Sequence, residues 1–248
     1  MSIFNLGQKI NLAKNFITKN SPLYVQFYIT PRCNLACEQC NIIYSDAKHN
    51  EIEIDKINKI ANNLSKIGVS IVLLIGGEPF VRKDIDQIVR AFTKKNIHVR
   101  LQTNGIATEA QLESCVKAGG RDISISLDTL EGSKQDEING GFLNSWNRAI
   151  NTISLVNKVF PDNSTAFFNS VIMPKNLNAI PKVIKFATKI GWGVSLVPVH
   201  VSSKKNPMAY RTIDDDNQVT FEDTNKQKEE IVNFIELLKS MKEKYNLY

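Results

Sequence analysis

Cys33, Cys37 and Cys40 stand within eight residues of one another and account for three of the four cysteines in the chain. They directly follow an apolar segment of strand length. Three thiolates so close along the chain can converge on one metal centre. A disulfide explains them less well, because one thiol would be left over and only Cys115 remains as a partner. Residues 33–40, the cysteine loop, therefore predict a metal centre.

The spacing of the cysteine loop favours some metal centres over others. Tetrahedral zinc needs a fourth ligand, and the nearest candidate is His49, nine residues after Cys40, without the paired spacing usual in zinc sites. Three cysteines without an obvious fourth ligand suit a cubane iron–sulfur cluster that leaves one iron open to a small ligand. An iron–sulfur cluster is the favoured interpretation, with zinc and a structural thiol cluster as alternatives.

Composition limits the class of protein. The chain has 248 residues, of which 42% are hydrophobic and 23% charged, as expected for one large globular domain. No apolar run approaches the roughly 18 residues of a membrane span, and residues 1–20 show no signal-peptide cleavage pattern. We therefore expect a cytoplasmic protein without a membrane partner. The net charge of +6 is spread without an arginine-rich block, which predicts a solvated basic surface rather than a nucleic-acid site.

Apolar segments of strand length alternate with segments of helical periodicity. After a leading helix at 2–19, strands are expected at 24–30, 70–75, 98–103, 121–128, 165–173 and 194–201. Helices are expected at 54–67, 84–95, 109–118, 145–160, 180–190 and, after a polar loop at 202–224, at 226–245. Six strand–helix units in alternation predict a parallel sheet with right-handed crossovers.

The polar motifs of the sequence stand where the expected strands end. The cysteine loop follows the first strand, Gly76-Gly77-Glu78-Pro79 the second and Thr103-Asn104-Gly105 the third, while Asp128 closes the fourth. Ligands of parallel α/β folds bind at the carboxyl ends of the strands. The sequence therefore predicts a single site assembled from these four segments.

Alternation within the strands indicates the shape of the sheet. In the segment 121–128, Ile123, Ile125 and Leu127 share one face, and the opposite face carries Ser124, Ser126 and Asp128. The apolar face would meet the helices, so the polar face would line an interior. Buried polar groups cost a few kcal/mol each when unpaired, which favours an incomplete, wide barrel with a polar lumen. An open sheet with one wet face is the alternative, disfavoured because parallel sheets are normally covered on both faces.

Taken together, residues 22 to about 201 resemble the core of the radical S-adenosylmethionine (radical SAM) superfamily, both in the cysteine spacing and in the order of the later motifs. This resemblance implies an α/β fold, a partial (β/α)6 TIM-like barrel, with a helical lead-in at 1–21 and a core domain at 22–248. It assigns Cys33, Cys37 and Cys40 to a [4Fe-4S] cluster. The amino and carboxylate groups of S-adenosylmethionine (SAM) would take the fourth iron.

The resemblance also implies the residues around SAM. Those expected to hold the methionine amino group are Gly76, Gly77, Glu78 and Pro79. Ser126 and Asp128 match contacts of the fourth strand to SAM or substrate. Asn104 and Asn169 match polar positions in the lumen of the family's barrel. Val197 and Pro198 match the backbone surface that lies near adenine. His200, at the end of the sixth strand, is a candidate for contact with substrate.

Two positions depart from the family pattern. Gln39 precedes the third cysteine, where the family commonly has an aromatic residue, so its contact with adenine would be polar or made by the backbone. Asn139-Gly140 stands where peptide-modifying members often read Arg-Gly, and that arginine contacts the SAM carboxylate. Arg100 is a candidate replacement, because a guanidinium suits a carboxylate. The remaining cysteine, Cys115, is expected to be a buried apolar thiol.

The resemblance implies a radical SAM enzyme, an iron-dependent oxidoreductase of unknown reaction subclass. One electron from a flavodoxin- or ferredoxin-like donor would cleave SAM, and the resulting 5′-deoxyadenosyl radical would abstract hydrogen from a peptide or small-molecule substrate. The core looks closest to members that modify peptides or cyclise the molybdopterin precursor. No cysteines follow for auxiliary clusters, so a minimal core enzyme or a fragment is expected. The alternative function is a non-catalytic zinc or iron–sulfur interaction module.

Overall fold

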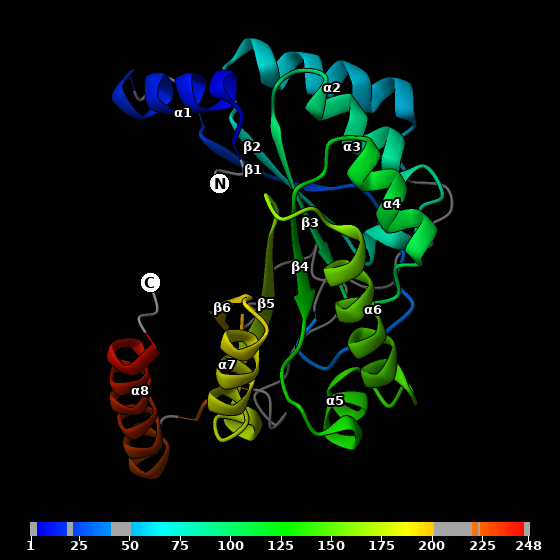
Figure 1. The fold of residues 1–248 in the computed structure, drawn as a ribbon. Coiled ribbons are helices and arrows are strands. Elements are labelled where there is room, and N and C mark those ends of the chain that lie inside the picture. Colours follow the sequence, from blue (N-terminus) through cyan, green and yellow to red (C-terminus); the bar gives the residue numbers. More distant parts are fainter. Residues whose placement is uncertain (1–3, 19–21, 41–50, 201–219, 223, 246–248) are drawn as a thin grey trace.

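The computed structural model describes residues 4–18, 22–40, 51–200, 220–222 and 224–245. Its strands form one parallel sheet in sequence order, with β1 and β6 at the two edges (Figure 1). The strands are β1 (Tyr24–Tyr28), β2 (Ile71–Ile75), β3 (His98–Thr103), β4 (Asp122–Ser126), β5 (Thr165–Ile172) and β6 (Gly193–Pro198). Each lies within the expected segment or within one residue of it.

Helices cover the outer face of the sheet. They are α2 (Ile54–Lys66), α3 (Ile85–Thr93), α4 (Glu109–Lys117), α6 (Ser145–Val159) and α7 (Ile180–Lys189), with α1 (Leu6–Thr18) before the sheet and α8 (Asn225–Tyr245) after it. Three short elements were not expected: α5 (Gly132–Ile138), η2 (Pro79–Val81) and η3 (Pro174–Asn176). Such short segments carry too little periodicity to be detected in the sequence.

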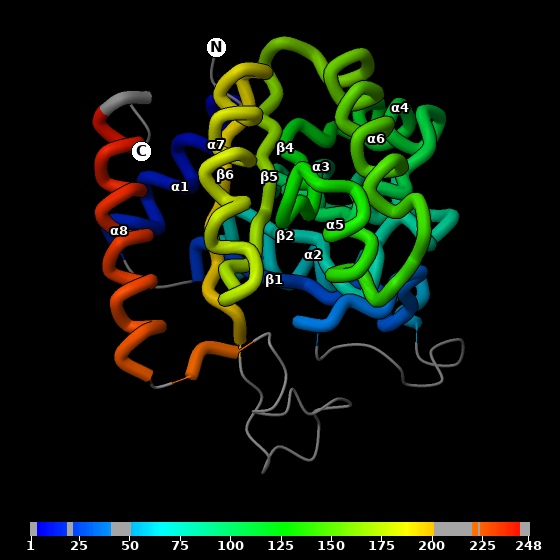
Figure 2. Tube along the Cα trace, turned by 90° about the horizontal axis from the view of Figure 1, so that it is seen from below, coloured from blue at the N-terminus to red at the C-terminus, as the bar shows by residue number. Residues whose placement is uncertain are grey.

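The sheet curls into a half-barrel, as Figures 1 and 2 show from two directions. Ile123, Ile125 and Leu127 are fully buried in the core that joins the sheet to the outer helices. Ser126 and Asp128, from the other face of β4, line an interior cavity. The partial barrel with a polar lumen is confirmed, and the flat sheet is not observed.

Helix α8 lies beside α7 (Figure 2). Phe234 and Met241 are buried in a cluster that includes Ile180 and Ile184 of α7. Helix α8 thus adds a further helix to the outer layer at this edge of the sheet. Ile235, next to Phe234, is 44% exposed, because a single neighbouring helix covers only a narrow stripe of α8.

The amino-terminal end of the sheet is closed by charged side chains that pair with one another. Asp122 forms an ion pair with Arg100, whose Nε lies 3.6 Å from Asp122 Oδ1. The other carboxylate oxygen, Oδ2, lies 3.4 Å from His98 Nε2. The Arg100 guanidinium also lies 4.6 Å from the centre of the Phe167 ring. His98 is therefore a buried structural residue at the end of the sheet away from the polar motifs.

Candidate functional site

A cavity of about 250 Å³ opens at the carboxyl end of the sheet. Its lining contains nearly all of the residues expected from the sequence: Cys33, Cys37, Gln39, Cys40, Gly76, Gly77, Glu78, Pro79, Asn104, Ser126, Asp128 and Asn169. Val197 and Pro198 lie at the exposed end of β6, outside this lining, and so does His200. Their roles stay predictions. Five segments far apart in the sequence thus meet at one place.

Gly76 and Gly77 allow the start of the cysteine loop to pass directly over the end of β2. A Cβ on Gly76 would lie 2.3 Å from the Thr30 carbonyl oxygen, and one on Gly77 would lie 2.1 Å from that of Arg32. The Gly77 N–H donates to the Thr30 carbonyl at 2.8 Å. Because no larger side chain fits at this separation, the two glycines are needed for the backbone contact itself.

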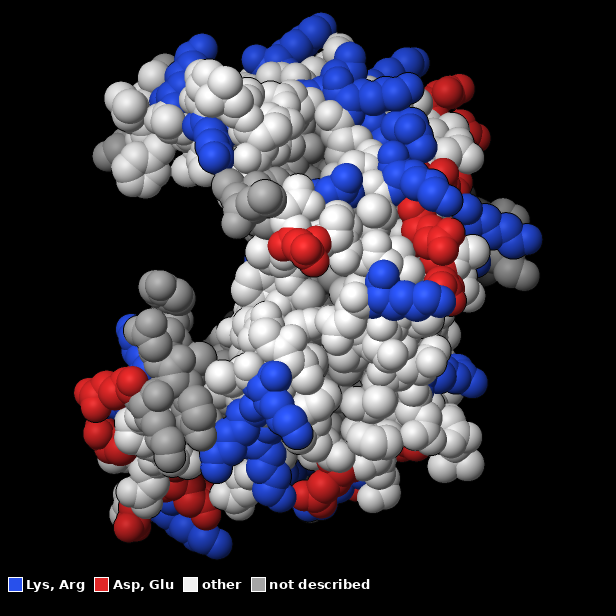
Figure 3. Space-filling model, in the orientation of Figure 1, with Lys and Arg blue, Asp and Glu red and all other residues white. Residues whose placement is uncertain are grey.

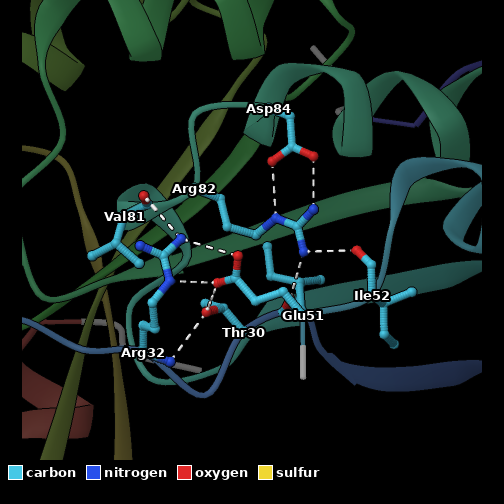
Figure 4. Close-up of polar contacts among 8 residues, drawn as sticks. Thr30, Arg32, Glu51, Ile52, Val81, Arg82 and Asp84 are labelled. Carbon is cyan, nitrogen blue, oxygen red and sulfur yellow. Dashed lines mark hydrogen bonds and ion pairs between the residues drawn. The ribbon is translucent and has the colours of Figure 1, made fainter. Parts of the chain in front are cut away.

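A charged network holds the same two segments from outside the cavity (Figure 4). Arg32 forms two hydrogen bonds with the Glu51 carboxylate, of 2.7 and 3.1 Å, and Thr30 also donates to Glu51. Arg82, only 5% exposed, pairs with Asp84 and donates to the carbonyls of residues 29 and 52 at 2.9 and 3.0 Å. Bidentate guanidinium contacts of this kind fix geometry as well as adding energy. No local pattern in the sequence indicates this network.

The other side of the cysteine loop rests on the end of α5. The N–H groups of Ala36 and Glu38 donate to the carbonyls of Asn139 and Ile138, at 3.3 and 3.0 Å. These carbonyls belong to the last turn of the helix, which otherwise has no hydrogen-bond donors for them. Gly140 has φ of +85°, and a Cβ there would lie 2.4 Å from the Ala36 oxygen. The backbone of Asn139-Gly140, where the sequence departs from the family pattern, thus supports the cysteine loop.

Lys175 adds an ionic contact to the loop. Its ammonium group pairs with Glu38 of the cysteine loop, and it lies 3.7 Å from Glu137 of α5. The Lys175 side chain is 17% exposed and follows β5, so it joins the loop to the far side of the barrel. The loop is therefore fixed at its start and through its middle.

The cysteine sulfurs lie in a buried, mutually repulsive arrangement. Burial raises the pKa of Cys33 to about 11. Burial also raises the pKa of Cys37, and the neighbouring Cys33 and Cys40 sulfurs raise it further. The thiolates need positive charge nearby, and ligation of a metal supplies it because a bound cysteine is deprotonated. By contrast Cys115 is fully buried in the apolar core, as expected.

The donor set fits an iron–sulfur cluster better than a single ion. Within the described ranges, no three His, Cys, Asp or Glu side chains come together as ligands of one metal ion. Thiolates without carboxylate or imidazole partners are the ligands of iron–sulfur clusters. His49, the fourth ligand considered for zinc, lies outside the described residues.

Three amide side chains around the cysteines each leave one buried atom without a hydrogen-bond partner. These atoms are Asn34 Nδ2, Gln39 Oε1 and Asn104 Oδ1. The other ends of the amides are held, since Asn104 donates to Asn34 Oδ1 at 2.8 Å and Gln39 donates to Asp128 at 3.3 Å. Buried polar atoms are almost always hydrogen-bonded. Of the three residues, Gln39 and Asn104 line the cavity, and their two oxygens fit a polar ligand that carries hydrogen-bond donors, as SAM does.

Glu78 is buried beneath the loop that it belongs to. Its carboxylate accepts hydrogen bonds from Phe80 N at 2.9 Å, Thr103 Oγ1 at 2.8 Å and Asn104 N at 2.6 Å. Burial raises the pKa of Glu78 to about 7, although these three bonds act in the opposite direction. The carboxylate thus ties the end of β2 to the end of β3. Its expected contact with an amino group stays a prediction.

Asp128 is the second buried carboxylate of the cavity. Its Oδ1 accepts from Val171 N at 2.7 Å, its Oδ2 accepts from Gln39, and its own N–H donates to Gln135 Oε1 at 2.8 Å. Burial raises the pKa of Asp128 to about 6, against the hydrogen bonds and the charge of Lys175. Asp128 therefore orients Gln39, and through it the Gln39 oxygen that faces the cavity.

Other residues were not singled out from the sequence or lie elsewhere. The cavity lining also includes Ile75, Gln102, Thr103, Asn139 and Val171. Gln102 shares the polar face of β3 with Asn104, which is the signal that could have identified it. Arg100 lies on this face too but pairs with Asp122 at the other end of the strand. Its proposed contact with a SAM carboxylate has no support in this arrangement.

Comparison with known proteins agrees with the geometry. The sequence profile of the Radical SAM superfamily matches residues 27–187, well over half of the chain. A probable GTP 3′,8-cyclase of Methanococcus vannielii is 33% identical over 165 residues, which cover 66% of this chain and 54% of the relative. An AdoMet-dependent heme synthase of Methanosarcina barkeri is 29% identical over 175 residues, 69% of this chain and 49% of the relative. The chain thus spans about half the length of these curated relatives.

Solved structures show the same fold. The crystal structure of Streptococcus suis SuiB bound to S-adenosylmethionine superposes with a TM-score of 0.66 and 20% sequence identity, over 92% of this chain and 52% of SuiB. An anSMEcpe structure with bound AdoMet gives a TM-score of 0.57 and 16% identity over 75% of this chain and 54% of that one. Each resemblance extends over most of the half-barrel.

Proposed function

The chain belongs to the radical SAM superfamily, and from this membership we propose that its cysteine loop holds the [4Fe-4S] cluster and that the adjoining cavity binds SAM. Cys33, Cys37 and Cys40 would be the cluster ligands. When bound and supplied with one electron, the cluster and SAM together generate a 5′-deoxyadenosyl radical that abstracts hydrogen from substrate. The chain would then act as an oxidoreductase. We assign residues 22–248 to the core domain and 1–21 to its helical lead-in.

One observation carries this proposal. The three cysteines line the same cavity as Gln39 and Asn104, whose buried amide oxygens have no hydrogen-bond partner. A structural thiol cluster or a zinc-binding module would explain the sulfurs but would leave these two oxygens unpaired, which folded proteins avoid. A cluster with an attached polar nucleoside ligand accounts for both features.

The residues of the chain would place and shield the reacting groups. Glu78 holds the loop after β2 against β3, so the backbone beside the amino group of SAM is fixed. Asp128 and Gln39 would orient the nucleoside, together with Asn104 and the β4 and β5 residues Ser126 and Asn169. The closed amino-terminal end of the barrel would keep water from entering behind the ligand. No acid–base pair is needed for hydrogen abstraction.

The substrate would enter from the open side of the half-barrel. Related proteins are named for the cyclisation of GTP and for heme synthesis, and SuiB has been crystallised with the precursor peptide SuiA. We propose a small molecule or a peptide as substrate and a flavodoxin- or ferredoxin-like electron donor. We place this protein in the cytoplasm, where cysteine thiols stay reduced.

Anaerobic reconstitution tests the proposal. We expect a brown protein that binds iron and sulfide, and that changes its electron paramagnetic resonance spectrum when SAM is added to the reduced form. Dithionite and SAM should then yield 5′-deoxyadenosine. The Cys37→Ser variant should lose all three properties, whereas Cys115→Ser, in the core, should keep them. A colourless protein that binds zinc, or a cluster that SAM leaves unchanged, would contradict the proposal.

A further inference from the structure

Helix α1 contacts the domain through its polar side. Gln8 and Asn15 are only 8% and 6% exposed. The amide of Asn15 donates to Ser70 Oγ at 3.2 Å, and that of Asn11 donates to the Gly68 carbonyl at 3.4 Å. A surface helix normally buries its apolar side against the core. In α1 the orientation is reversed, because the residues that dock it are amides.

The opposite side of α1 is apolar and exposed. Leu6, Ile10, Phe16 and Ile17 are exposed by 73%, 60%, 71% and 78%, and we call these four residues the α1 stripe. Leu6, Ile10 and Ile17 follow the spacing of one helical face, with Phe16 beside them. Large apolar side chains gathered on one exposed face mark a surface that contacts something less polar than water.

Basic residues lie on α1 and on the part of the domain beside it. Lys9 and Lys14 are exposed on α1 itself, and no Asp or Glu precedes Glu38 in the sequence. On the docked side of α1, a groove of about 480 Å³ that includes Gln8 is also lined by Arg90, Lys94, Lys117 and Arg121, and its described lining contains no carboxylate. Figure 3 shows basic side chains over α1 and the neighbouring helices. The α1 stripe therefore lies on a helix that carries only basic charges, next to a basic part of the domain.

We propose that α1 binds the surface of an anionic lipid bilayer, with the α1 stripe among the lipid headgroups and acyl chains and the lysines on the phosphates. Amphipathic helices that lie in the membrane interface combine such a stripe with flanking lysines. A second copy of this chain is a poorer occupant, since it would place two sets of lysines together. No described helix is long and apolar enough to cross a bilayer. The sequence expectation of no membrane partner rested on spans and signal peptides, and an interfacial helix is neither.

Vesicle flotation of the full, cluster-loaded protein tests the proposal. We expect roughly tenfold stronger binding to phosphatidylcholine vesicles that contain about 30% phosphatidylglycerol than to phosphatidylcholine alone. High salt should weaken the binding, because it screens the lysines. Replacing Phe16 by Trp should add a fluorescence signal that shifts to the blue when these anionic vesicles are added.

Matched variants distinguish binding through the α1 stripe from non-specific adsorption to vesicles. The double change Ile10→Asn and Ile17→Asn should abolish flotation, and Lys9→Gln with Lys14→Gln should lower it several-fold. Leu143→Asn, which removes an apolar side chain that is 79% exposed elsewhere, should change nothing. The melting temperature should be the same in all variants, because these side chains project into solvent.

Equal binding to both kinds of vesicle, or flotation that survives the double change, would overturn the proposal. So would a dimer that forms with rising protein concentration, is lost in the double variant and shows no affinity for vesicles. That result would assign the α1 stripe to a second copy of the chain.

Discussion

Both ends of the half-barrel carry polar residues but use them differently. At the amino-terminal end, Asp122 lies within ion-pair distance of Arg100 and His98, and the Arg100 guanidinium lies over the ring of Phe167. At the carboxyl end, Gln39 and Asn104 line a cavity, and each keeps one buried oxygen without a partner. The first end also has unpartnered atoms, Asp122 Oδ1 and Thr165 Oγ1, but its charges are paired with one another, whereas the second end is open to a ligand.

The difference shows how a polar lumen divides between stability and binding. Side chains that complete one another stabilise the fold, and their loss leaves a buried charge or dipole behind. Side chains with free atoms contribute little to folding, because those atoms find their partners only when a ligand is present. Changes at the first end should therefore alter the stability of the fold but not the affinity for the ligand. Changes at the second end should alter the affinity but not the stability. The backbone beneath the second end is an exception, since it must be rigid to keep the cavity open.

The largest effect is expected from Gly140→Ala, because this substitution changes the backbone that supports the cysteine loop. A Cβ at position 140 would lie 2.4 Å from the Ala36 oxygen, and the residue has φ of +85°. Strain in the left-handed region costs about 1 kcal/mol, and displacement of the cysteine loop adds about 2 kcal/mol more. Unfolding by denaturant should show a loss of about 3 kcal/mol in free energy, and iron content after reconstitution should fall to near zero.

Gly141→Ala is the matched control. It has φ of +79° but no atom within 4 Å of the added Cβ, so it should lose only the strain of about 1 kcal/mol and keep its iron. Equal losses in the two variants would mean that strain alone matters, and that the end of α5 does not hold the cysteine loop.

Arg100→Met should affect stability at the amino-terminal end and leave the cavity unchanged. Asp122, which is 6% exposed, would lose a charged partner inside the lumen. Because Arg100 itself is 26% exposed, we expect a loss of about 2 kcal/mol in unfolding free energy rather than the full cost of breaking a buried pair. Affinity for SAM, measured by calorimetry on the loaded protein, should not change.

Arg148→Met, on the exposed side of α6, serves as its control and should leave both quantities unchanged. A weakened SAM affinity in Arg100→Met alone would show that the guanidinium reaches the ligand, as the sequence had suggested. It would also erase the distinction between the two ends.

The sequence was sufficient for the fold wherever periodicity was strong. The alternation of Ile123, Ile125 and Leu127 with polar residues gave both the strand β4 and its orientation, because a strand buried against helices on one face shows a period of two. α5 could not be found in this way. Only its end, at Asn139, contacts the cysteine loop, and that contact depends on the path of the backbone rather than on side-chain type.

The residues that line the cavity could be predicted from the sequence, whereas those that hold the cysteine loop in place could not. The cysteines and Gly76-Gly77 are local motifs whose spacing carries the information. The contact between Lys175 and Glu38 joins residues 137 positions apart, so no local pattern encodes it. The role of Glu78 also needed the structure, since only the fold brings Thr103 and the Asn104 N–H to its carboxylate.

Lys175→Met tests one of these supports and should have a smaller effect. Loss of the partly buried contact with Glu38 should lower the unfolding free energy by about 1 kcal/mol. Iron should also pass to a chelator several-fold faster, because the middle of the cysteine loop is less firmly held. Lys182→Met removes a lysine that is 61% exposed and pairs with Glu131, and should change neither. Identical rates of iron loss in the two variants would show that the link to β5 is dispensable.

Asp128 should make stability depend on pH. Burial raises its pKa in the folded state to about 6 from 3.8, so the folded state binds the proton more tightly than the unfolded chain. Its contribution is complete below about pH 4 and is lost as the pH rises through 6. Between pH 5 and 7.5 the wild type should lose about 1 kcal/mol relative to Asp128→Asn, which does not titrate. Parallel denaturation profiles of the cluster-free proteins would contradict the raised pKa.

Gln39→Leu should have the smallest effect on stability. It also gives the sharpest contrast between an amide with an unpartnered buried atom and an amide whose hydrogen bonds are complete. The change removes a hydrogen bond of 3.3 Å to Asp128 but also a buried oxygen without a partner, so the net change should stay within about 0.5 kcal/mol. SAM affinity should nevertheless fall several-fold. Gln111→Leu removes an amide whose groups bond to Phe80 and the α4 cap, and should cost about 1 kcal/mol of stability without any effect on SAM. If the two glutamines behaved alike, an unpartnered atom would be no guide to where this barrel binds its ligand.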